Sequence, residues 1–477
     1  MTAVAASDGT ARDPELVLAG PAAAYVQLVA AGGLPGEPGF LDGAERAAVR
    51  RTGALADGRP WPASAVLPVP AAVAASVAER GRLTLVDSDG TPLAAVSRPR
   101  LWTDDAGVPH VAGPVTLTRP RTAAPAPRPH RPTVAVPLSD VPGTAELAAL
   151  AGAAAGADLV LMPRVAEPGP LGLPADGLVR AVEAAAAAAL PRGTRVQPVP
   201  LLAEPDPVGD AALAARVAQA YGADSVVLLG PAPPGVGPTG VGPTAPLPVT
   251  WLGAPRPSVP EITGRLDRGE PVGEHLLPGP AARVLAAYRP PLSRRGIVVL
   301  FTGLSGAGKS TIARALAGAL PAAGRPKVTL LDGDVVRRML SSELTFSAEH
   351  RDLNVRRIGY VAAEVARHGG VAICAPIAPY AASRLAVREM VEAAGGLFLL
   401  VYVATGIEVC EERDIKGLYR RARAGQLVGL TGVDDPYEVP GDSDLVLDGG
   451  RLPVAAAVDA VLDTMHGRGW LSRWDGP

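Results

Sequence analysis

Two stretches of the chain alternate short apolar runs with alanine-rich runs, which is the pattern of parallel strands with covering helices. In the first stretch, strand-like runs lie at 133–136, 159–162, 199–202 and 225–229, and helical runs lie at 145–155, 178–190 and 211–220. The second stretch begins at Gly296 with the buried-strand run GIVVLF, and a further strand is expected at 327–331. Both stretches therefore predict α/β domains.

The other segments lack this alternation. Residues 1–120 mix short helical and strand-like runs, such as RLTLV at 82–86 before a DSDG turn, and indicate a small α+β or β-rich domain. The Pro- and Arg-rich run 119–132 is typical of an extended linker, and the Pro- and Gly-rich run 231–246 of a long loop. We therefore expect four parts, at 1–120, 133–253, 254–294 (a small helical tail and connector) and 295–477.

Composition and charge exclude several classes of protein. The 477 residues are 48% hydrophobic and 19% charged, which is enough apolar material for several buried cores. A formal net charge of −2 gives no general attraction to nucleic acid or anionic membranes, and no apolar run is long enough to span a bilayer. We therefore expect a cytoplasmic protein without a nucleic-acid or membrane partner. Cys374 and Cys410 lie in apolar runs and are expected to be buried thiols.

The strongest motif is GLSGAGKS at 303–310, between the strand run at 296–301 and a helical run at 311–320. Its glycines let backbone N–H groups face phosphate, Lys309 reaches the terminal phosphates, and the Ser310 hydroxyl can coordinate Mg²⁺. Lys309 is one of only three lysines among 45 basic residues, which indicates a chemical need for an ammonium group. We therefore expect ATP and Mg²⁺ as cofactors, with Ser310 as the metal ligand. The expected ATP-binding residues are Gly303, Leu304, Ser305, Gly306, Ala307, Gly308, Lys309, Ser310 and Thr311.

Two aspartates follow the next predicted strand. Asp332 and Asp334 lie at its carboxyl end, where open α/β sheets bind ligands. Taken alone, Asp-Gly-Asp is as well explained by an ordinary turn. One βαβ unit after a phosphate loop, however, a carboxylate can orient an acceptor hydroxyl or hold water on Mg²⁺, as phosphoryl transfer requires.

A cluster of aromatic, basic and amide side chains comes next. It comprises Phe346, Arg351, Asn354, Arg356 and Arg357, and Asn354 is the only asparagine of the chain. Arg351 and Asn354 are spaced to share one face of a helix. The cluster is explained either by a solvated basic helix or by a pocket for an acceptor nucleotide, with phosphate held by an arginine fork and a base stacked on Phe346.

Seven motifs in order make residues 296–472 resemble adenylyl-sulfate kinase. They are GLSGAGKST at 303–311, DGD at 332–334, FS at 346–347, the run 351–359, IAPY at 377–380, DIKGLY at 414–419 and TGVDDPY at 431–437. That family transfers the γ-phosphate of ATP to the 3′-hydroxyl of adenosine 5′-phosphosulfate (APS). The resemblance implies a P-loop NTPase-type parallel sheet, with Asp334 and Lys309 as catalytic residues. The implied substrate-binding residues are Asp332, Arg337, Phe346, Arg351, Asn354, Ile377, Lys416, Gly429 and Leu430.

Two departures from the family pattern bear on mechanism. Ala378 stands where the family often carries a serine that is described as phosphorylated, so direct in-line transfer is implied. Leu430 stands where a lid aromatic would stack on a nucleotide base, which is expected to weaken stacking without abolishing binding.

The first 290 residues are more distantly similar to ATP sulfurylase, which implies a PUA-like domain followed by a nucleotidyltransferase-like, Rossmann-type α/β domain. The segment LSDVP at 138–142 stands where that family has Gln-Thr-Arg-Asn-Pro, and Thr144 and Leu147 stand at the tentative histidine positions. Gly230–Gly235 reads GPAPPG in place of Gly-Arg-Asp-His-Ala-Gly. Because Asp140 replaces an arginine, a site for triphosphate and sulfate is not expected to work.

The sequence thus favours an adenylyl-sulfate kinase whose sulfurylase-like half is inactive. Two alternatives remain: a bifunctional enzyme that makes the phosphosulfate from ATP and sulfate, and a nucleotide-sensing module that regulates a partner sulfurylase. The expected partners are APS, a separate ATP sulfurylase and further copies of the chain in a homo-oligomer.

Overall fold

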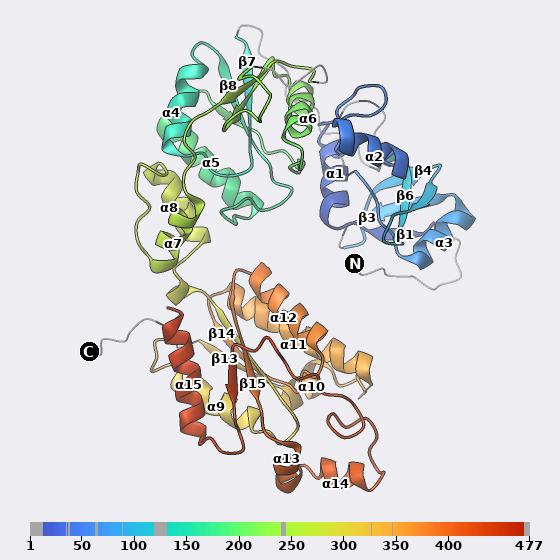
Figure 1. The fold of residues 1–477 in the computed structure, drawn as a ribbon, viewed down its shortest axis with the longest axis vertical. Coiled ribbons are helices and arrows are strands. Elements are labelled where there is room, and N and C mark those ends of the chain that lie inside the picture. Colours follow the sequence, from blue (N-terminus) through green and yellow to red (C-terminus); the bar gives the residue numbers. More distant parts are fainter. Residues whose placement is uncertain are drawn as a thin grey trace. The chain divides into compact units, whose positions relative to one another are not determined.

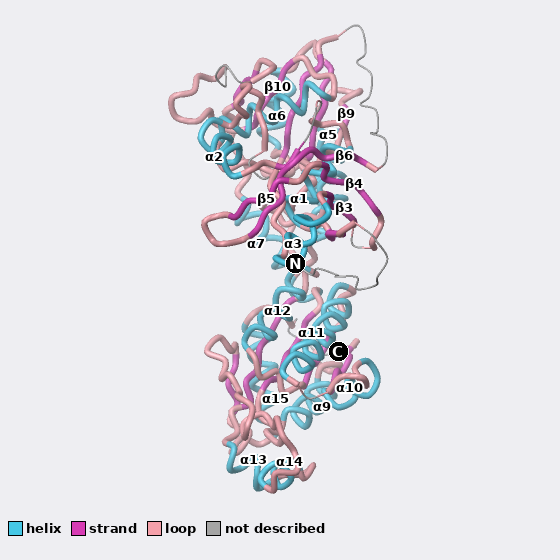
Figure 2. The backbone as a smooth tube through the Cα atoms, turned by 90° about the vertical axis from the view of Figure 1, so that its right-hand side faces the viewer, coloured by secondary structure: helices cyan, strands magenta, loops and turns pink. Residues whose placement is uncertain are grey.

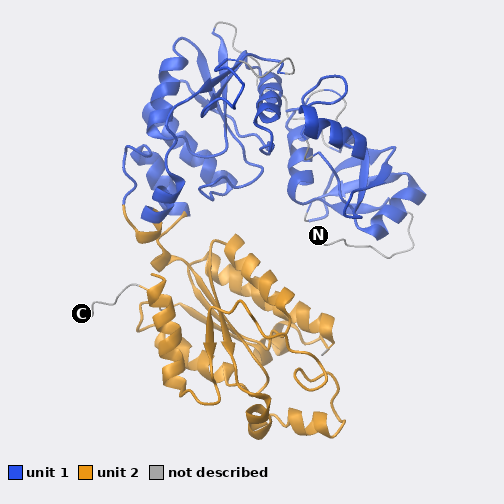
Figure 3. Cartoon of the chain, in the orientation of Figure 1, with its two compact units in different colours: residues 1–265, 271–288 blue, residues 266–270, 289–477 orange. Residues whose placement is uncertain are grey.

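The computed structural model describes residues 13–34, 36, 39–62, 65–87, 89–118, 131–239, 245–325, 327–345 and 347–471. Two compact units are present, one of residues 1–265 with 271–288 and one of residues 266–270 with 289–477 (Figure 3). Within the described residues, unit 1 holds two sheets and unit 2 holds one. Most of the expected linker at 119–132, and residues 240–244 of the expected loop, lie outside the described residues. Among the described residues, no helix has the length and apolar character needed to cross a membrane.

The first sheet of unit 1 is mixed, with strands in the order β1-β3-β4-β6-β2 and β5 paired to β6. Its strands are β1 (Glu15–Val17), β2 (Gly39–Phe40), β3 (Arg82–Val86), β4 (Pro92–Ser97), β5 (Arg100–Thr103) and β6 (Pro109–Leu117). Three helices accompany it, α1 (Gly20–Ala30), α2 (Gly43–Thr52) and α3 (Ala71–Arg80). Helix α2 begins where it does because Asp42 and Glu45 form a capping box, and it ends at Gly53, whose φ is +70°.

The second sheet is parallel throughout, in the order β11-β10-β7-β8-β9. Its strands are β7 (Thr133–Leu138), β8 (Asp158–Pro163), β9 (Arg195–Val196), β10 (Ser225–Leu229) and β11 (Val249–Leu252). The prediction of a strand at 199–202 is wrong. The strand that pairs with β8 is β9, and Val199 makes only an isolated bridge to Arg164. Pro198 and Pro200 have no N–H group, so the segment cannot continue a ladder. Strand β11 was not expected from the sequence.

Five helices are described along the rest of this part of the chain. They are α4 (Thr144–Ala153), α5 (Ala175–Ala189), α6 (Pro207–Ala220), α7 (Val259–Arg268), which extends into unit 2, and α8 (Gly279–Tyr288). Side chains of both domains of unit 1 share one apolar core, to which Trp61, Leu67, Leu213 and Val217 belong. Hydrogen bonds between described residues of the two domains include those from Arg216 Nη1 to Pro60 O at 3.1 Å and from Tyr221 Oη to Ala31 O at 3.1 Å.

Unit 2 is built on a parallel sheet of five strands in the order β13-β14-β12-β15-β16. The strands are β12 (Ile297–Thr302), β13 (Val328–Asp332), β14 (Val371–Ala375), β15 (Leu397–Val403) and β16 (Leu445–Leu447). The helices are η1 (Leu292–Arg294), α9 (Lys309–Ala319), α10 (Gly333–Leu340), α11 (Ala348–Arg367), α12 (Ala381–Ala393), α13 (Ile407–Arg413), α14 (Leu418–Arg423) and α15 (Val454–Gly467). Figures 1 and 2 show these elements as a ribbon and as a tube.

Alternate residues of the central strand β12 face two apolar cores. Ile297, Val299 and Phe301 pack with α9 and α15, whereas Val298 and Leu300 pack with α11 and α12. The sheet is therefore a buried layer between two pairs of helices (Figure 1). Because all five strands are parallel, their carboxyl ends meet at one edge, and helices α13 and α14 follow β15 beyond that edge. This edge carries the candidate site.

Candidate functional site

The phosphate loop connects the central strand β12 to helix α9. Gly303 has φ of +145°, and a Cβ there would lie 2.6 Å from Val403 O, so only glycine fits. Gly308, at φ +105°, is the N-cap of α9, and Lys309 is the first residue of that helix. The turn therefore directs the loop N–H groups and the N-terminus of α9 to the same edge of the sheet, the arrangement that binds phosphate.

Lys309 is buried within this loop, with 6% of its surface exposed. Its Nζ donates to Gly303 O at 2.9 Å and to Leu304 O at 2.7 Å. Burial lowers the pKa of the ammonium from 10.5 to about 8, while Cys410 and the carboxylates of Asp334 and Asp332 act in the opposite direction. Burying the charged ammonium costs free energy, and the negative charge of a bound triphosphate would offset that cost.

The two predicted aspartates come together at the end of β13. Asp332 is in register with Ala375 of β14, is 5% exposed, and its Oδ1 accepts from the N–H of Asp334 at 3.1 Å as the N-cap of α10. Arg314 of α9 donates to its other oxygen at 3.1 Å. Asp334 is exposed and forms an ion pair with Lys416, which lies between α13 and α14. One buried, bound carboxylate and one accessible carboxylate therefore lie beside the phosphate loop.

The predicted acceptor residues lie on α10, α11 and the segment after β14. Arg337 donates to Leu344 O at 3.1 Å and Thr345 O at 3.0 Å, and burial, followed by the charge of Arg351, lowers its pKa. Arg351 is mostly buried and donates to Thr431 Oγ1 at 2.6 Å and to Asp435. Two arginines therefore lie close to one another near Asp334, the charge pattern expected where an anionic nucleotide binds.

Asn354 is 6% exposed, and its Oδ1 has no hydrogen-bond partner among the described residues. An unsatisfied buried amide oxygen costs free energy, and such groups often serve a ligand. Phe346, the predicted stacking residue, lies outside the described residues. Of the five-residue cluster, Arg356 and Arg357 are occupied elsewhere, by Asp352 and Glu343 respectively.

The segment after β14 joins the phosphate loop directly. Ile377 O accepts from Thr302 Oγ1 at 2.7 Å and from the N–H of Gly303 at 3.3 Å. Ala378 is buried and has φ of +46°, an unusual conformation for a residue with a Cβ. These hydrogen bonds connect Ile377 to the first residue of the loop. The predicted acceptor subsite and the predicted ATP subsite are therefore directly bonded to each other.

The predicted lid positions are held by a single carboxylate. Asp434 accepts from the N–H groups of Gly429 and Leu430, the latter at 2.5 Å. The side chain of Leu430 is 6% exposed and belongs to the apolar core that contains Tyr419 and Phe301. Its placement in that core means that the leucine presents little surface to a nucleotide base.

Sequence reasoning missed several side chains that support the site. Thr302, Tyr380, Asp435 and Tyr437 contact predicted site residues or the segment that carries them, and Tyr419 Oη donates to Ser305 O at 2.9 Å. The motifs at 377–380, 414–419 and 431–437 contain most of these residues, but the motifs gave no hint of which partner each side chain contacts. The two cysteines are buried free thiols, as expected.

The sulfurylase-like positions in unit 1 are engaged in structural contacts. Asp140 accepts from the N–H groups of Val141 at 2.8 Å and Leu171 at 2.7 Å, and burial raises its pKa to about 6. Leu147 is fully buried, and Thr144 Oγ1 donates to Glu274 O at 2.6 Å. These side chains organise loops and core rather than present cations to a triphosphate.

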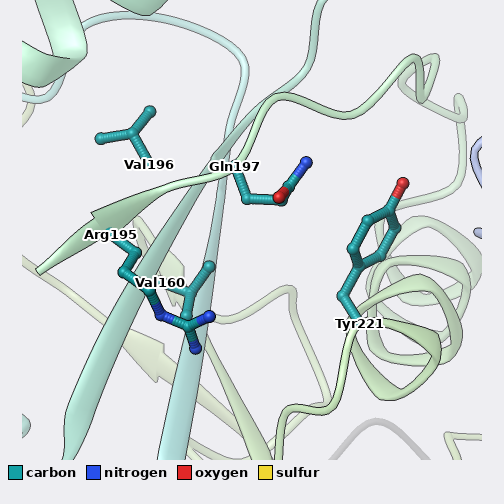
Figure 4. A pocket seen from close by; sticks show the side chains of 5 residues that line it. All are labelled: Val160, Arg195, Val196, Gln197 and Tyr221. Atoms are coloured by element: carbon teal, nitrogen blue, oxygen red, sulfur yellow. The ribbon is translucent and has the colours of Figure 1, made fainter. Parts of the chain in front are cut away.

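A cavity of about 340 Å³ lies in unit 1, and none of the residues that line it is a predicted site residue (Figure 4). It is lined by Val160, Arg195, Val196, Gln197 and Tyr221. Its walls come from β8, β9 and the end of α6, and it shares no residue with the phosphate loop, so the site is defined by the strand ends of unit 2 and not by this cavity.

Comparisons with known proteins show which family the chain resembles. The family model described as adenylylsulphate kinase matches residues 295–448. A hexameric APS kinase from Thiobacillus denitrificans is 31% identical, with a TM-score of 0.68, and the alignment covers 96% of this chain and 94% of that one. The Mycobacterium tuberculosis APS kinase, solved with AMPPNP and APS, is 38% identical over 36% of this chain and 98% of that chain, with a TM-score of 0.35.

A sulfate adenylyltransferase of Aspergillus terreus is 44% identical over 213 residues, which are 45% of this chain and 37% of the relative. The chain thus spans less than two-fifths of the length of the curated relatives that it matches. The family-model match and the Thiobacillus denitrificans neighbour confirm the predicted kinase resemblance and the α/β fold of unit 2.

Proposed function

Because the chain belongs to the adenylylsulphate kinase family, we propose that it transfers the γ-phosphate of ATP to the 3′-hydroxyl of APS, giving 3′-phosphoadenosine 5′-phosphosulfate (PAPS). The observation that carries this proposal is the convergence, at one sheet edge, of a phosphate loop with Lys309, an accessible Asp334, and the acceptor-side residues Arg351 and Asn354. Donor and acceptor groups gathered at one edge of a parallel sheet suit a transfer between two bound nucleotides.

The transfer forms a bond between phosphorus and the 3′-oxygen and breaks the bond between phosphorus and the β–γ bridging oxygen, so ADP leaves. In this proposal the loop N–H groups and Lys309 carry the charge of the phosphates, and Asp334 accepts or orients the proton of the 3′-hydroxyl. Lys416 now pairs with Asp334. The incoming hydroxyl would compete for that carboxylate, leaving the Lys416 ammonium to contact phosphate.

Magnesium fits the donor set. Ser310 lies in the first turn of α9, one residue after Lys309, and Asp332 is fixed near the same loop by Arg314. Mg²⁺ in such sites is held by one or two protein oxygens together with substrate phosphates. We assign Ser310 as the residue that would hold the ion, with Asp332 orienting bound water, and the ion would supply positive charge to offset that of the ATP phosphates.

The acceptor would be held by Arg337, Arg351, Asn354 and Ile377. The arginines supply charge for the phosphosulfate, and the buried oxygen of Asn354 supplies an acceptor for an amino group such as that of adenine. Ala378 has no hydroxyl, so no phosphoserine intermediate can form there and transfer is direct. Gly429, Leu430 and Phe346 are assigned to the lid and base-stacking side by the resemblance alone.

We further propose that the sulfurylase-like region is catalytically inactive. Leu147 is buried and Asp140 is bonded to backbone, so neither can hold an anion. The similarity to an APS kinase extends over 96% of the chain, which fits a kinase carrying this region as part of its architecture. Because the matched relative from Thiobacillus denitrificans is described as hexameric, we expect a homo-oligomer here, working in the cytoplasm where ATP is available.

The proposal is tested by ADP release from the purified full chain with MgATP and APS, compared with MgATP and sulfate plus pyrophosphatase. Turnover with APS alone, lost in Lys309→Ala, is the expected result. Turnover with sulfate would instead establish the bifunctional enzyme. Binding of both nucleotides without turnover would favour a sensor that regulates a partner sulfurylase. Light scattering after gel filtration measures the oligomeric state.

A further inference from the structure

The motif at 431–437 has no role in the mechanism above, although it contacts both halves of the site. We call residues 431–438 the brace segment. It follows the lid positions Gly429 and Leu430 and passes beside α11 and the segment after β14. Its polar side chains Thr431, Asp434, Asp435, Tyr437 and Glu438 all have hydrogen-bond partners, although Asp434 and Glu438 are also exposed to solvent.

One end of the brace segment holds the acceptor arginine. Asp435 and Thr431 both bind Arg351 Nη1, and Tyr380 Oη donates to Asp435 at 3.2 Å. The side chains of Arg351 and Asp435 are 11% and 17% exposed, so this ion pair is largely desolvated. A partly buried guanidinium that makes two hydrogen bonds is held in one orientation, whereas a free one samples many.

The other end holds the strand that enters the phosphate loop. Tyr437 Oη lies 2.9 Å from Thr302 Oγ1, and Thr302 in turn binds Ile377 O. Glu438 completes the attachment: its N–H donates to Pro379 O at 3.0 Å and its carboxylate accepts from Ala381 at 2.6 Å. The brace segment thus spans from the acceptor arginine to the residue before Gly303.

We propose that Asp435 is a positioning residue for the acceptor nucleotide, because it fixes the guanidinium of Arg351 in the orientation that receives the anionic groups of APS. The inference rests on the proposed function, since it takes Arg351 as an acceptor-binding residue. Asp435 has no other charged partner among the described residues than Arg351.

If Asp435 fixes the orientation of Arg351, its removal should weaken the binding of APS and not that of ATP. Without the carboxylate, Arg351 must be ordered by the ligand itself, and long cationic side chains lose considerable rotamer entropy when they are ordered. Asp435→Asn should therefore raise the KM for APS roughly tenfold, while kcat falls by less and the KM for ATP stays within about twofold. The asparagine keeps a hydrogen-bonding group of the same size for Thr431 and Tyr380.

The experiment measures kcat and both KM values for wild type, Asp435→Asn and Asp435→Glu, with the melting temperature of each. Glu364→Gln is the matched control, because Glu364 also pairs with an arginine of α11, Arg367, but at an exposed position. The control should match wild type, and Asp435→Glu should recover part of the APS affinity. In an Arg351→Lys background, Asp435→Asn should have a much smaller effect on the KM for APS.

Three outcomes would overturn the inference: an unchanged KM for APS in Asp435→Asn, equal losses for ATP and APS that track a lowered melting temperature, or full additivity with Arg351→Lys. A failure of the proposed function looks different. In that case the wild-type chain itself shows no turnover with APS, and titration calorimetry shows no APS binding that Asp435→Asn could weaken.

Discussion

Raising the pH from 7 to 9 should weaken ATP binding, because the loop lysine loses its charge in this interval. Burial lowers the pKa of Lys309 from 10.5 to about 8. The folded protein therefore holds a charged lysine below pH 8 and a neutral one above it. Only the charged form attracts the triphosphate. One pH unit above the pKa leaves roughly a tenth of the molecules charged, so the affinity at pH 9 should be about tenfold lower than at pH 7.

The same lowered pKa has a consequence for stability. In the unfolded chain Lys309 stays protonated up to about pH 10.5, so burying the charged form opposes folding below about pH 8. This opposition fades as the pH rises from 8 towards 10.5. Nucleotide binding and stability should therefore respond in opposite directions to alkaline pH at this one residue.

The assay is titration calorimetry with AMPPNP at pH 7, 8 and 9, in pairs of buffers with different ionisation enthalpies. Binding raises the pKa of the lysine, so proton uptake should grow from near zero at pH 7 towards about one proton at pH 9. The second ionisation of phosphate groups, near pH 6, is nearly complete over this range. Lys309→Arg is the control, because its guanidinium stays charged and its affinity should not depend on pH. An affinity independent of pH in wild type would refute the reasoning.

Three substitutions test the packing argument. Gly303→Ala should lower the free energy of unfolding by about 3 kcal/mol and abolish ATP binding, because the residue has φ of +145° and its Cβ would meet Val403 O. A urea-unfolding curve of this variant equal to that of the wild type would contradict this. Gly318→Ala, in an exposed turn of α9 with nothing within 4 Å, should instead stabilise by about 1 kcal/mol in the same measurement. Arg164→Ala should cost about 3–5 kcal/mol in thermal or urea unfolding, because it leaves Asp210 without its bidentate partner; a change below about 1 kcal/mol would show the pair to be dispensable.

The phosphate loop and the two aspartates of unit 2 could be predicted from the sequence because each depends on local features. Glycine spacing, a preceding apolar run and a rare lysine suffice to specify a phosphate loop, and the structure places Lys309 in the first turn of α9 as the motif requires. The aspartates at 332 and 334 were placed at a strand end by the same local logic. Periodicity failed where proline intervened, at 199–202, since an apolar run says nothing about missing N–H groups in a ladder.

The amino-acid sequence by itself determined the α/β class, the phosphate loop and the list of candidate side chains, because each depends on neighbours within a few residues. Only the tertiary structure decided which of them meet. Arg351 and Asp435 are 84 positions apart, so no local pattern relates them. Their pairing depends on how α11 packs against the segment after the lid. The burial that lowers the pKa of Lys309, and that leaves Asn354 Oδ1 without a partner among the described residues, likewise arises from packing between distant segments, which no motif encodes.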